Sequence, residues 1–347
     1  MGTVGVVVNP LAGKDLRRLV SAATHTSDGV KIGIVRRVVA AAAETGADEI
    51  LLARDRHRLA ERAVEGLDAP VRLLDDELTN TRVDTAAAAE RFRNEGVRAV
   101  VALGGDGTCR DIAIGWPDAP LIAISTGTNN VYPSAVDGTS AGTAAALVAL
   151  GDVPLAEVAQ RTKRVVVRCD DDGFGVPFDD IALVEAALID TTFVGARAVH
   201  DPTTIRAVVA AVAHPASTGL SSIAGRLAPC AASDDHGVFV GIGAGERSVR
   251  VPLAPGSFAT LGISETRPLP LCETVRLEGP GVLAYDGERD RRIGAGAVIH
   301  LHIDRNGPHL IDVASALTTA AHARRFDAVV LPTTRSTHPS QEVRHGS

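Results

Sequence analysis

The sequence is short of aromatic residues and of lysines. Phe, Trp and Tyr together make up 3% of the 347 residues, so any core must be built from Ala, Val, Leu and Ile. The only lysines are Lys14, Lys31 and Lys163, which leaves arginine to supply most contacts to phosphate. Arginine suits that role because its planar fork matches two phosphate oxygens.

Several kinds of protein are disfavoured by what is missing. The net charge of −7 argues against non-specific nucleic-acid binding, which depends on clustered basic residues. No apolar run approaches the roughly 18 residues of a membrane span, and no signal peptide precedes the first predicted strand. The four cysteines show no metal-ligand spacing and are expected to be reduced thiols. We therefore expect a cytoplasmic protein without nucleic-acid or membrane partners.

Strand and helix patterns alternate through the first half of the chain. Apolar runs predict strands at 3–8, 48–53, 70–75, 99–103 and 121–124. Helical spacing of apolar residues predicts helices between and after them, at 30–45, 55–66, 81–95, from Thr108 onward, and at 140–151. This alternation predicts a parallel α/β sheet whose ligands bind beyond the carboxyl ends of the strands.

The pattern changes near residue 160, where short strand signals separated by Gly, Pro and Asp begin. The second domain is therefore expected to be mostly antiparallel β, with a helix at 202–215 and a turn at 241–245. Four parts follow: an α/β nucleotide-binding domain (1–160), a β-rich acceptor-binding domain (161–308), a strand and helix returning to the first domain (309–327), and a flexible tail (328–347).

Three glycine-bearing loops follow predicted strands. The first begins at Asn9 and reads NPLAGK, the second is GGDGT from Gly104, and the third is STGTNN from Ser125. Because the carboxyl ends of parallel strands meet at one edge of a sheet, we expect the loops to converge on one crevice suited to phosphate. The Walker spacing and the G-x-S-x-G elbow are both missing, so neither a P-loop nor a serine hydrolase is indicated.

Local sequence leaves alternatives open at four positions. Asp106 is either a reactive carboxylate or an Asx-type turn residue, and Lys14 is either near a phosphate or solvated at a loop tip. Arg110 either pairs with a phosphate or is an exposed helix arginine. Asp286 either contributes a second carboxylate or forms an ordinary Asp-Gly turn.

GGDGT after a buried strand, with NPLAG upstream and STGTNN downstream, resembles the superfamily of NAD kinases, diacylglycerol kinases and sphingosine kinases. The stretch from Gly104 to Ala149 is most similar to the AcoX-type, ATP-NAD kinase-like branch associated with acetoin catabolism. The resemblance extends to about residue 325. It implies an NAD kinase-like two-domain fold, use of ATP and Mg²⁺, and a homo-oligomer, either a dimer or a tetramer.

The resemblance also implies roles for single residues. Asp106, Glu185 in ALVEA and Asp286 in YDGERD take the catalytic positions, and Asp286 is also the implied metal-binding residue. The implied nucleotide-binding residues are Asn9, Pro10, Gly13, Lys14, Gly104, Gly105, Gly107, Thr108, Arg110, Thr126, Gly127, Thr128, Asn129 and Asn130.

Two positions depart from the NAD kinase pattern. Val184 replaces the asparagine of A-L-N-E-V, and the G-S-T-A-Y stretch has only residues 221–225 as its nearest counterpart. The leading hypothesis is a Mg²⁺-dependent kinase that transfers a phosphoryl group from ATP to a hydroxyl of NAD, NADH or a related small polar metabolite. The alternatives are a catalytically silent nucleotide-binding regulatory protein and a lipid kinase of the diacylglycerol type.

Overall fold

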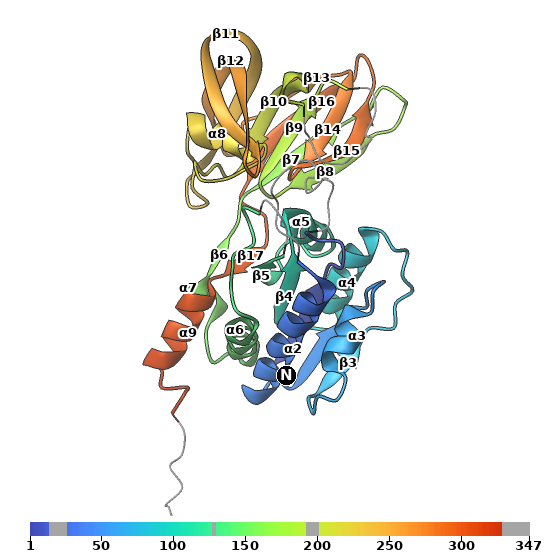
Figure 1. The fold of residues 1–347 in the computed structure, drawn as a ribbon, viewed down its shortest axis with the longest axis vertical. Helices are drawn as coiled ribbons and strands as arrows, with labels where there is room; N and C mark the ends of the chain where they lie inside the picture. The colour runs from blue at the N-terminus through green and yellow to red at the C-terminus, as the bar shows by residue number, and fades with distance from the viewer. Residues whose placement is uncertain (14–25, 127–129, 192–200, 328–347) are drawn as a thin grey trace, which may run out of the picture.

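The computed structural model describes residues 1–13, 26–126, 130–191 and 201–327. An α/β part and a β-rich part lie at opposite ends of the long axis (Figure 1). The predicted fold class is confirmed, because a parallel sheet with helices on both faces precedes two mostly antiparallel sheets.

A seven-stranded sheet forms the centre of the α/β part, in the order β3-β2-β1-β4-β5-β17-β6. Its strands are parallel except β6, which runs antiparallel to β17. The strand β17 comes from near the end of the chain and pairs with β5. The bounds are β1 (Thr3–Val8), β2 (Glu49–Leu52), β3 (Val71–Leu73), β4 (Ala99–Gly104), β5 (Pro120–Ser125), β6 (Ala159–Arg161) and β17 (His309–Ile311).

Helices cover both faces of this sheet. One face packs against α2 (Asp28–Glu44), α3 (Leu59–Val64), α6 (Gly138–Leu150) and α9 (Val313–His322), and α7 (Leu155–Val158) lies beside α9. The other face packs against α4 (Val83–Asn94) and α5 (Asp106–Gly115).

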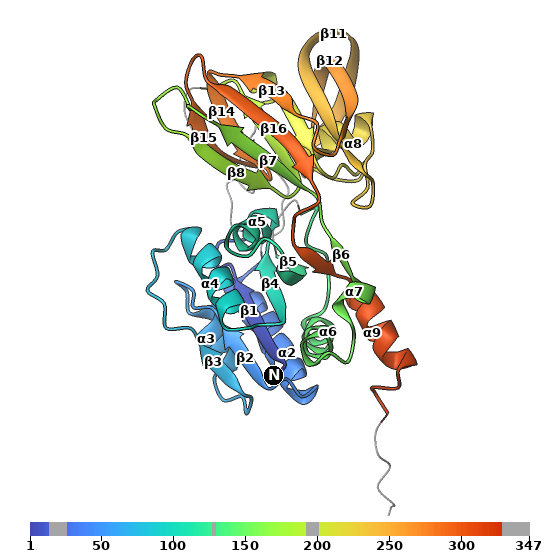
Figure 2. The same ribbon diagram turned by 180° about the vertical axis from the view of Figure 1, so that it is seen from behind.

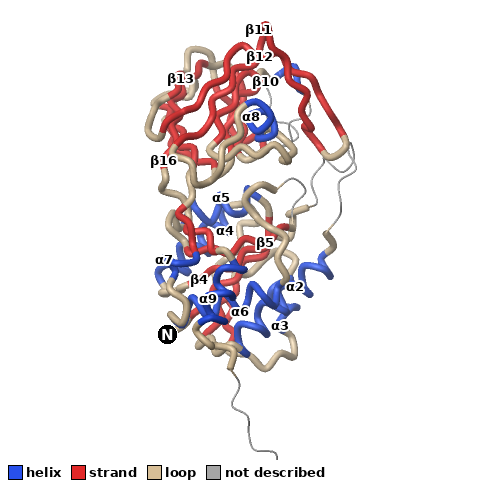
Figure 3. Tube along the Cα trace, turned by 90° about the vertical axis from the view of Figure 1, so that its left-hand side faces the viewer, coloured by secondary structure: helices blue, strands red, loops and turns tan. Residues whose placement is uncertain are grey.

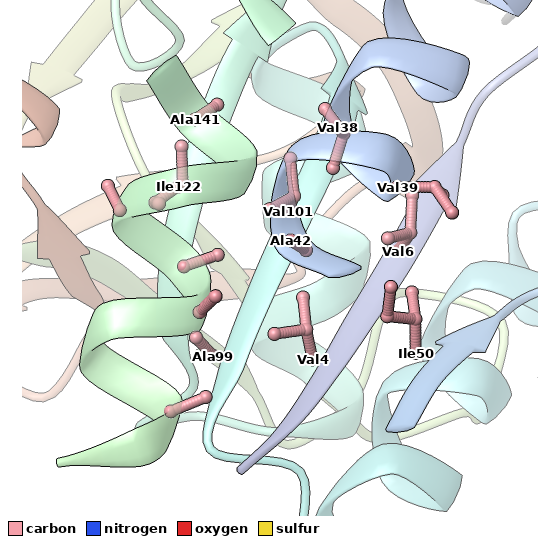
Figure 4. Close-up of a cluster of buried hydrophobic side chains, with 14 of the residues drawn as sticks. Val4, Val6, Val38, Val39, Ala42, Ile50, Ala99, Val101, Ile122 and Ala141 are labelled. Carbon is pink, nitrogen blue, oxygen red and sulfur yellow. The ribbon is translucent and has the colours of Figure 1, made fainter. Parts of the chain in front are cut away.

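Small side chains allow close packing on the first face. Val38, Val39 and Ala42 of α2 meet the valines of β1 and β4 (Figure 4). A Cβ on Gly142 of α6 would lie 2.2 Å from the carbonyl oxygen of Val38, so only glycine lets α6 approach α2 this closely. The core contains few aromatic residues, and it is filled because α2 and α6 pack closely together.

The β-rich part is a sandwich of two sheets around one apolar cluster. The six-stranded sheet contains β9 (Glu185–Ile189), β10 (Ile205–Ala210), β11 (His236–Ala254), β12 (Ser257–Pro270), β14 (Gly281–Tyr285) and β15 (Glu288–Ile293). The four-stranded sheet contains β7 (Arg164–Cys169), β8 (Phe178–Ala182), β13 (Val275–Glu278) and β16 (Val298–Asp304). The short helices are η1 (Pro202–Thr204) and α8 (Ser221–Leu227), and α8 packs on the outer face of the six-stranded sheet.

Two local predictions in this part are wrong. The segment 202–215 is not a helix, because its apolar run forms β10 between β9 and β11, where pairing on both sides outweighs helical propensity. The glycines at 241–245 do not form a turn; they lie inside β11, where the pairing with β12 shifts register. Figure 3 shows β11 and β12 as a long ribbon at the end of the molecule.

Helix α5 lies where the two parts meet. Figure 2 shows it beyond the end of β4, next to the β-rich part, and it contacts β8 directly. Within the described residues, no helix has the length and hydrophobicity needed to cross a bilayer.

Candidate functional site

A cleft of about 250 Å³ lies between the loops at the carboxyl ends of the parallel strands and the β14–β15 turn. Ten of the residues predicted for the site line this cleft. They are Asn9, Pro10, Gly13, Gly105, Asp106, Gly107, Thr108, Arg110, Asn130 and Asp286. The structure therefore brings the first two glycine loops, and Asn130 of the third, together with the Asp-Gly turn of the β-rich part.

The remaining predicted residues fall into two groups. Gly104, Thr126 and Glu185 are not among the described residues that line the cleft. The other four, Lys14, Gly127, Thr128 and Asn129, lie outside the described residues. The predicted roles of all seven stay predictions.

The GGDGT loop passes directly from β4 into α5. A Cβ on Gly104 would lie 2.3 Å from the hydroxyl oxygen of Thr108, so the first glycine is needed for the loop to close. A Cβ on Gly107 would meet no atom within 4 Å, which leaves the backbone there open to a ligand. Gly105 is the N-cap and offers no side-chain hydrogen bond. The amino end of α5 is therefore arranged as an anion-binding helix terminus.

The loop after β1 is tied to the GGDGT loop by one side chain. The amide nitrogen of Asn9 donates to the hydroxyl oxygen of Thr108 at 2.9 Å, while its amide oxygen accepts from the backbone of Leu11 and Ala12. The two predicted phosphate-facing loops are thus fixed relative to each other.

Lys31 was not predicted as a site residue, yet it organises the same loop. Its ammonium group donates to the carbonyl oxygens of Asn9, Pro10 and Ala12 at 3.0, 2.8 and 2.7 Å. The Lys31 side chain is fully buried in α2. Helical spacing alone predicts that such a lysine is solvated, and no signal in the sequence distinguishes Lys31 from an exposed helix lysine.

Asp106 is a buried residue at the start of α5 whose carboxylate is engaged by backbone. Its oxygens accept the N–H of Val131 at 3.1 Å and the N–H of Tyr132 at 2.8 Å. These bonds join the GGDGT loop to the segment after β5. These N–H groups lie about 25 residues along the chain, so the bonds are long-range contacts and do not form an Asx-type turn, and the catalytic role of Asp106 stays a prediction.

Arg110 is buried, so its interpretation as an exposed helix arginine is wrong. Its guanidinium donates to the Asp180 carboxylate at 2.7 Å, to the Asp290 carboxylate at 3.2 Å, and to the carbonyl of Ile181 at 2.6 Å. It also lies over the ring of Tyr285, 4.5 Å from the centroid. Arg110 therefore links the two parts of the molecule at the cleft wall.

Asp286 is held by the backbone at the turn between β14 and β15. Its oxygens accept the N–H groups of Leu183, Val184 and Glu185 at 3.1, 2.8 and 3.3 Å. Burial raises the pKa of Asp286, against the opposing effects of Arg110 and these N–H groups. The residue has a φ of 49°, so the Asp-Gly turn interpretation holds for its backbone, and its metal-binding role stays a prediction.

Further cleft residues were missed by the motif search. They come from the loop after β2, the start of α4 and the residues just before it, the body of α5, the end of β14 and the start of β15. They comprise Arg54, Asp55, Arg56, Asn80, Thr81, Arg82, Asp84, Thr85, Asp111, Tyr285, Glu288 and Asp290. The first two groups also follow strands of the parallel sheet. The rule that ligands bind at those strand ends was therefore a usable signal for them.

The cleft is richer in carboxylates than in arginines. Seven acidic side chains and four arginines line it. Arg82 and Arg110 both approach Asp290, and although burial acts in the opposite direction, they hold the pKa of that carboxylate below its ordinary value. An anionic ligand is expected to enter such a cleft together with a divalent cation that offsets the remaining negative charge.

A second cluster of polar side chains lies in the β-rich part. Ligand atoms of Cys230, Asp234 and His236 lie within 4.8 Å of one another, although the cysteines showed no metal-ligand spacing in the sequence. The buried ammonium of Lys163 donates to the Cys230 sulfur at 3.2 Å. Because a lysine already faces the thiol, we assign no metal to this group.

Comparison with known families divides the chain as the two parts suggest. Residues 4–153 match the ATP-NAD kinase N-terminal domain, and residues 163–306 match the acetoin catabolism protein X C-terminal domain. Acetoin catabolism protein X of Cupriavidus necator is 33% identical over 339 residues, which cover 91% of this chain and 92% of that protein.

Two solved structures are similar to this chain to different degrees. Yeast NADH kinase complexed with NADH has a TM-score of 0.52 at 13% identity, covering 95% of this chain and 89% of that chain. A diacylglycerol kinase from Bacillus anthracis str. Sterne has a TM-score of 0.41 at 10% identity, covering 89% of this chain and 96% of that chain. The first similarity shows an NAD kinase-like fold over 95% of this chain.

Proposed function

This chain belongs to the family of acetoin catabolism protein X, and from that membership together with its NAD kinase-like fold we propose that it is an ATP-dependent kinase. The reaction transfers the γ-phosphoryl group of ATP to a hydroxyl of a small polar acceptor. NAD or NADH is the first candidate, because one structural relative is an NADH kinase complexed with NADH.

One observation carries the proposal: the amino end of α5 and the loop after β1 are joined by hydrogen bonds into a single cradle in the cleft. Asn9 joins the two loops through Thr108, and Lys31 fixes the backbone of the β1 loop from behind. The space beside Gly107, and the lack of a side-chain cap at Gly105, leave the amino end of the helix available to phosphate. Catalysis of phosphoryl transfer depends largely on such positioning.

The size of the cleft suits the phosphate end of a nucleotide, and its charge requires that a cation accompany the phosphates. Its volume of about 250 Å³ is below the roughly 300–1,000 Å³ of sites that enclose a whole drug-sized ligand. The excess of carboxylates is compatible with MgATP as the substrate, because the cation neutralises part of the charge on the phosphates. The acceptor would then approach from the β-rich part, past Tyr285 and Glu288.

Calorimetric titration with MgADP tests the binding half of the proposal. Thr108→Val removes the hydroxyl that joins the two loops. Loss of this hydrogen bond is expected to weaken MgADP binding about tenfold, which corresponds to a binding free energy of roughly 1.4 kcal/mol. Thr318→Val is the matched control, because the hydroxyl of Thr318 bonds only within the exposed surface of α9. Equal affinity for all three proteins would contradict the cradle.

An acceptor screen tests the transfer half. Wild-type protein is incubated with γ-labelled ATP, Mg²⁺ and, in separate reactions, NAD, NADH, ribose and glycerol. Label in one acceptor supports the kinase. MgADP binding with no labelled product in any reaction would instead support a catalytically silent nucleotide-binding protein.

A further inference from the structure

Asp111 differs from the other carboxylates of the cleft. Six of the seven have a hydrogen bond or another interaction; Asp55 caps α3, for example, and Asp84 accepts from Thr79 and Asn80. Among the described residues, Asp111 has neither a hydrogen bond nor an ion pair, although only 9% of it is exposed. It is a buried, unpartnered carboxylate in the wall of the cleft.

The oxygens of Asp111 reach the cleft. The fully buried side-chain oxygens without a partner, among the described residues, belong to Thr126, Thr266 and Tyr285. Asp111 is absent from that set and lines the cleft, so its carboxylate keeps some access to the space between the two parts. A ligand hydroxyl in the cleft can therefore contact it.

The charge of the neighbouring Arg110 opposes the effect of burial on the pKa of Asp111, but its donors are committed elsewhere and form no hydrogen bond with this carboxylate. Arg110 is bound to Asp180, Asp290 and the backbone of Ile181. The other charged groups that act on Asp111 are Arg82, Glu288 and Asp290, of which only the arginine favours the ionised form. An unpaired buried carboxylate destabilises a fold, and its presence in a cleft indicates a function.

We propose that Asp111 accepts the proton of the acceptor hydroxyl during phosphoryl transfer; this assignment rests on the proposed kinase function. The acceptor O–H bond breaks and its proton moves to a carboxylate oxygen of Asp111. The acceptor oxygen forms a bond to the γ-phosphorus, and the bond from that phosphorus to the β–γ bridging oxygen breaks. ADP leaves with the electron pair of the broken bond.

Two further observations support this assignment over Asp106. Both oxygens of Asp106 already accept backbone N–H groups, so a proton would have to displace those bonds. Burial raises the pKa of Asp111 to about 7, which suits a group that takes up and releases a proton near neutral pH. Asp106 then orders the loop, and Asp111 takes part in the chemistry.

The test compares Asp111→Asn with wild type and with Asp118→Asn, the same change at an exposed position outside the cleft. Label transfer from γ-labelled ATP is measured from pH 5.5 to 9 with Mg²⁺ and the panel of NAD, NADH, ribose and glycerol. The asparagine at 111 is expected to lower kcat by about 10²- to 10⁴-fold, with MgADP affinity unchanged. The wild-type and Asp118→Asn rates are expected to fall below about pH 7, while the residual Asp111→Asn rate does not.

Three results would overturn the assignment. A wild-type rate and pH profile in Asp111→Asn would remove Asp111 from the chemistry while leaving the kinase in place. Recovery of the Asp111→Asn rate at high Mg²⁺, or loss of MgADP binding in that variant, would make Asp111 a cation or nucleotide ligand. Absence of transfer by wild type itself would overturn the kinase function, and with it the role of Asp111.

Discussion

Replacing Asp111 by asparagine should stabilise the folded protein, and the gain should grow as pH rises. Burial raises the pKa of this carboxyl from its ordinary 3.8 to about 7, a difference of about three units. One unit corresponds to about 1.4 kcal/mol, so ionisation of Asp111 in the folded state costs about 4 kcal/mol.

The sign follows from proton uptake. Between about pH 4 and pH 7 the folded wild type keeps a proton on Asp111 that the unfolded chain has released. The contribution of this group to stability is therefore complete below the unfolded pKa and is lost as pH rises through the folded one. Because asparagine cannot ionise, residue 111 does not lower the variant's free energy of unfolding as pH rises.

Urea unfolding at pH 5 and pH 8 measures the effect. The single tryptophan, Trp116, is the C-cap of α5 and is nearly buried, so its fluorescence reports on the helix that carries Asp111. The difference in unfolding free energy between variant and wild type is expected to increase by roughly 3 kcal/mol from pH 5 to pH 8. Asp118→Asn is expected to show no such increase.

A difference that stays constant between pH 5 and pH 8 would refute the reasoning. It would mean that Asp111 is solvated or paired in the folded state and titrates as it does in the unfolded chain. Ionisation of Asp111 in the folded state would then carry no free-energy cost, and the structure would no longer support its proposed role.

Other predictions concern the walls of the cleft. Gly104→Ala should lower the free energy of unfolding by about 1–3 kcal/mol, because its Cβ would overlap a threonine side chain. Gly107→Ala should leave that free energy equal or higher and should weaken MgADP binding, because its Cβ would cover the open backbone. Urea unfolding measures the first effect and calorimetry the second. Lys31→Met should cost about 3 kcal/mol and weaken MgADP binding, since three loop carbonyls lose a charged donor. Arg110→Met should cost about 3 kcal/mol, because the nearly buried Asp180 loses its nearest charged partner and retains only Arg82, at 4.0 Å. Arg82→Met removes a more exposed ion pair and should cost less than about 1 kcal/mol in the same assay.

The parallel sheet was predictable because its strands are short apolar runs with little ambiguity. Each of the strands β1, β2, β4 and β5 is buried along nearly its whole length, and each is followed by a polar or glycine-rich loop. The rule that such loops meet at one edge of the sheet then located the cleft before any contact was known.

The wrong predictions arose where distant pairing outweighs local preference. The segment 202–215 is rich in alanine and reads as helical, yet Ile205–Ala210 pairs with β9 on one side and β11 on the other. No local pattern predicts a strand that is stabilised on both sides by segments elsewhere in the chain.

The most informative site residues were also the least predictable. Arg110 is buried only because Asp180 and Asp290 approach it from the β-rich part. The isolation of Asp111 follows from the same arrangement, since its neighbour is already paired. Lys31 contacts the loop after β1 because of where α2 lies in the fold. These properties depend on side chains brought together from both parts, which composition and spacing do not encode.

The most direct test of the kinase proposal is the fate of the γ-phosphoryl group of ATP. Wild-type protein is mixed in excess over γ-labelled ATP with Mg²⁺ and NADH, or with the other hydroxylated acceptors of the panel, and the labelled products are separated after a single turnover. The proposed function predicts label in a phosphomonoester of one acceptor, formed by wild type, and the proposed role of Asp111 predicts its loss in Asp111→Asn. Label that stays in ATP, or appears only as inorganic phosphate with every acceptor, would contradict the proposed transfer.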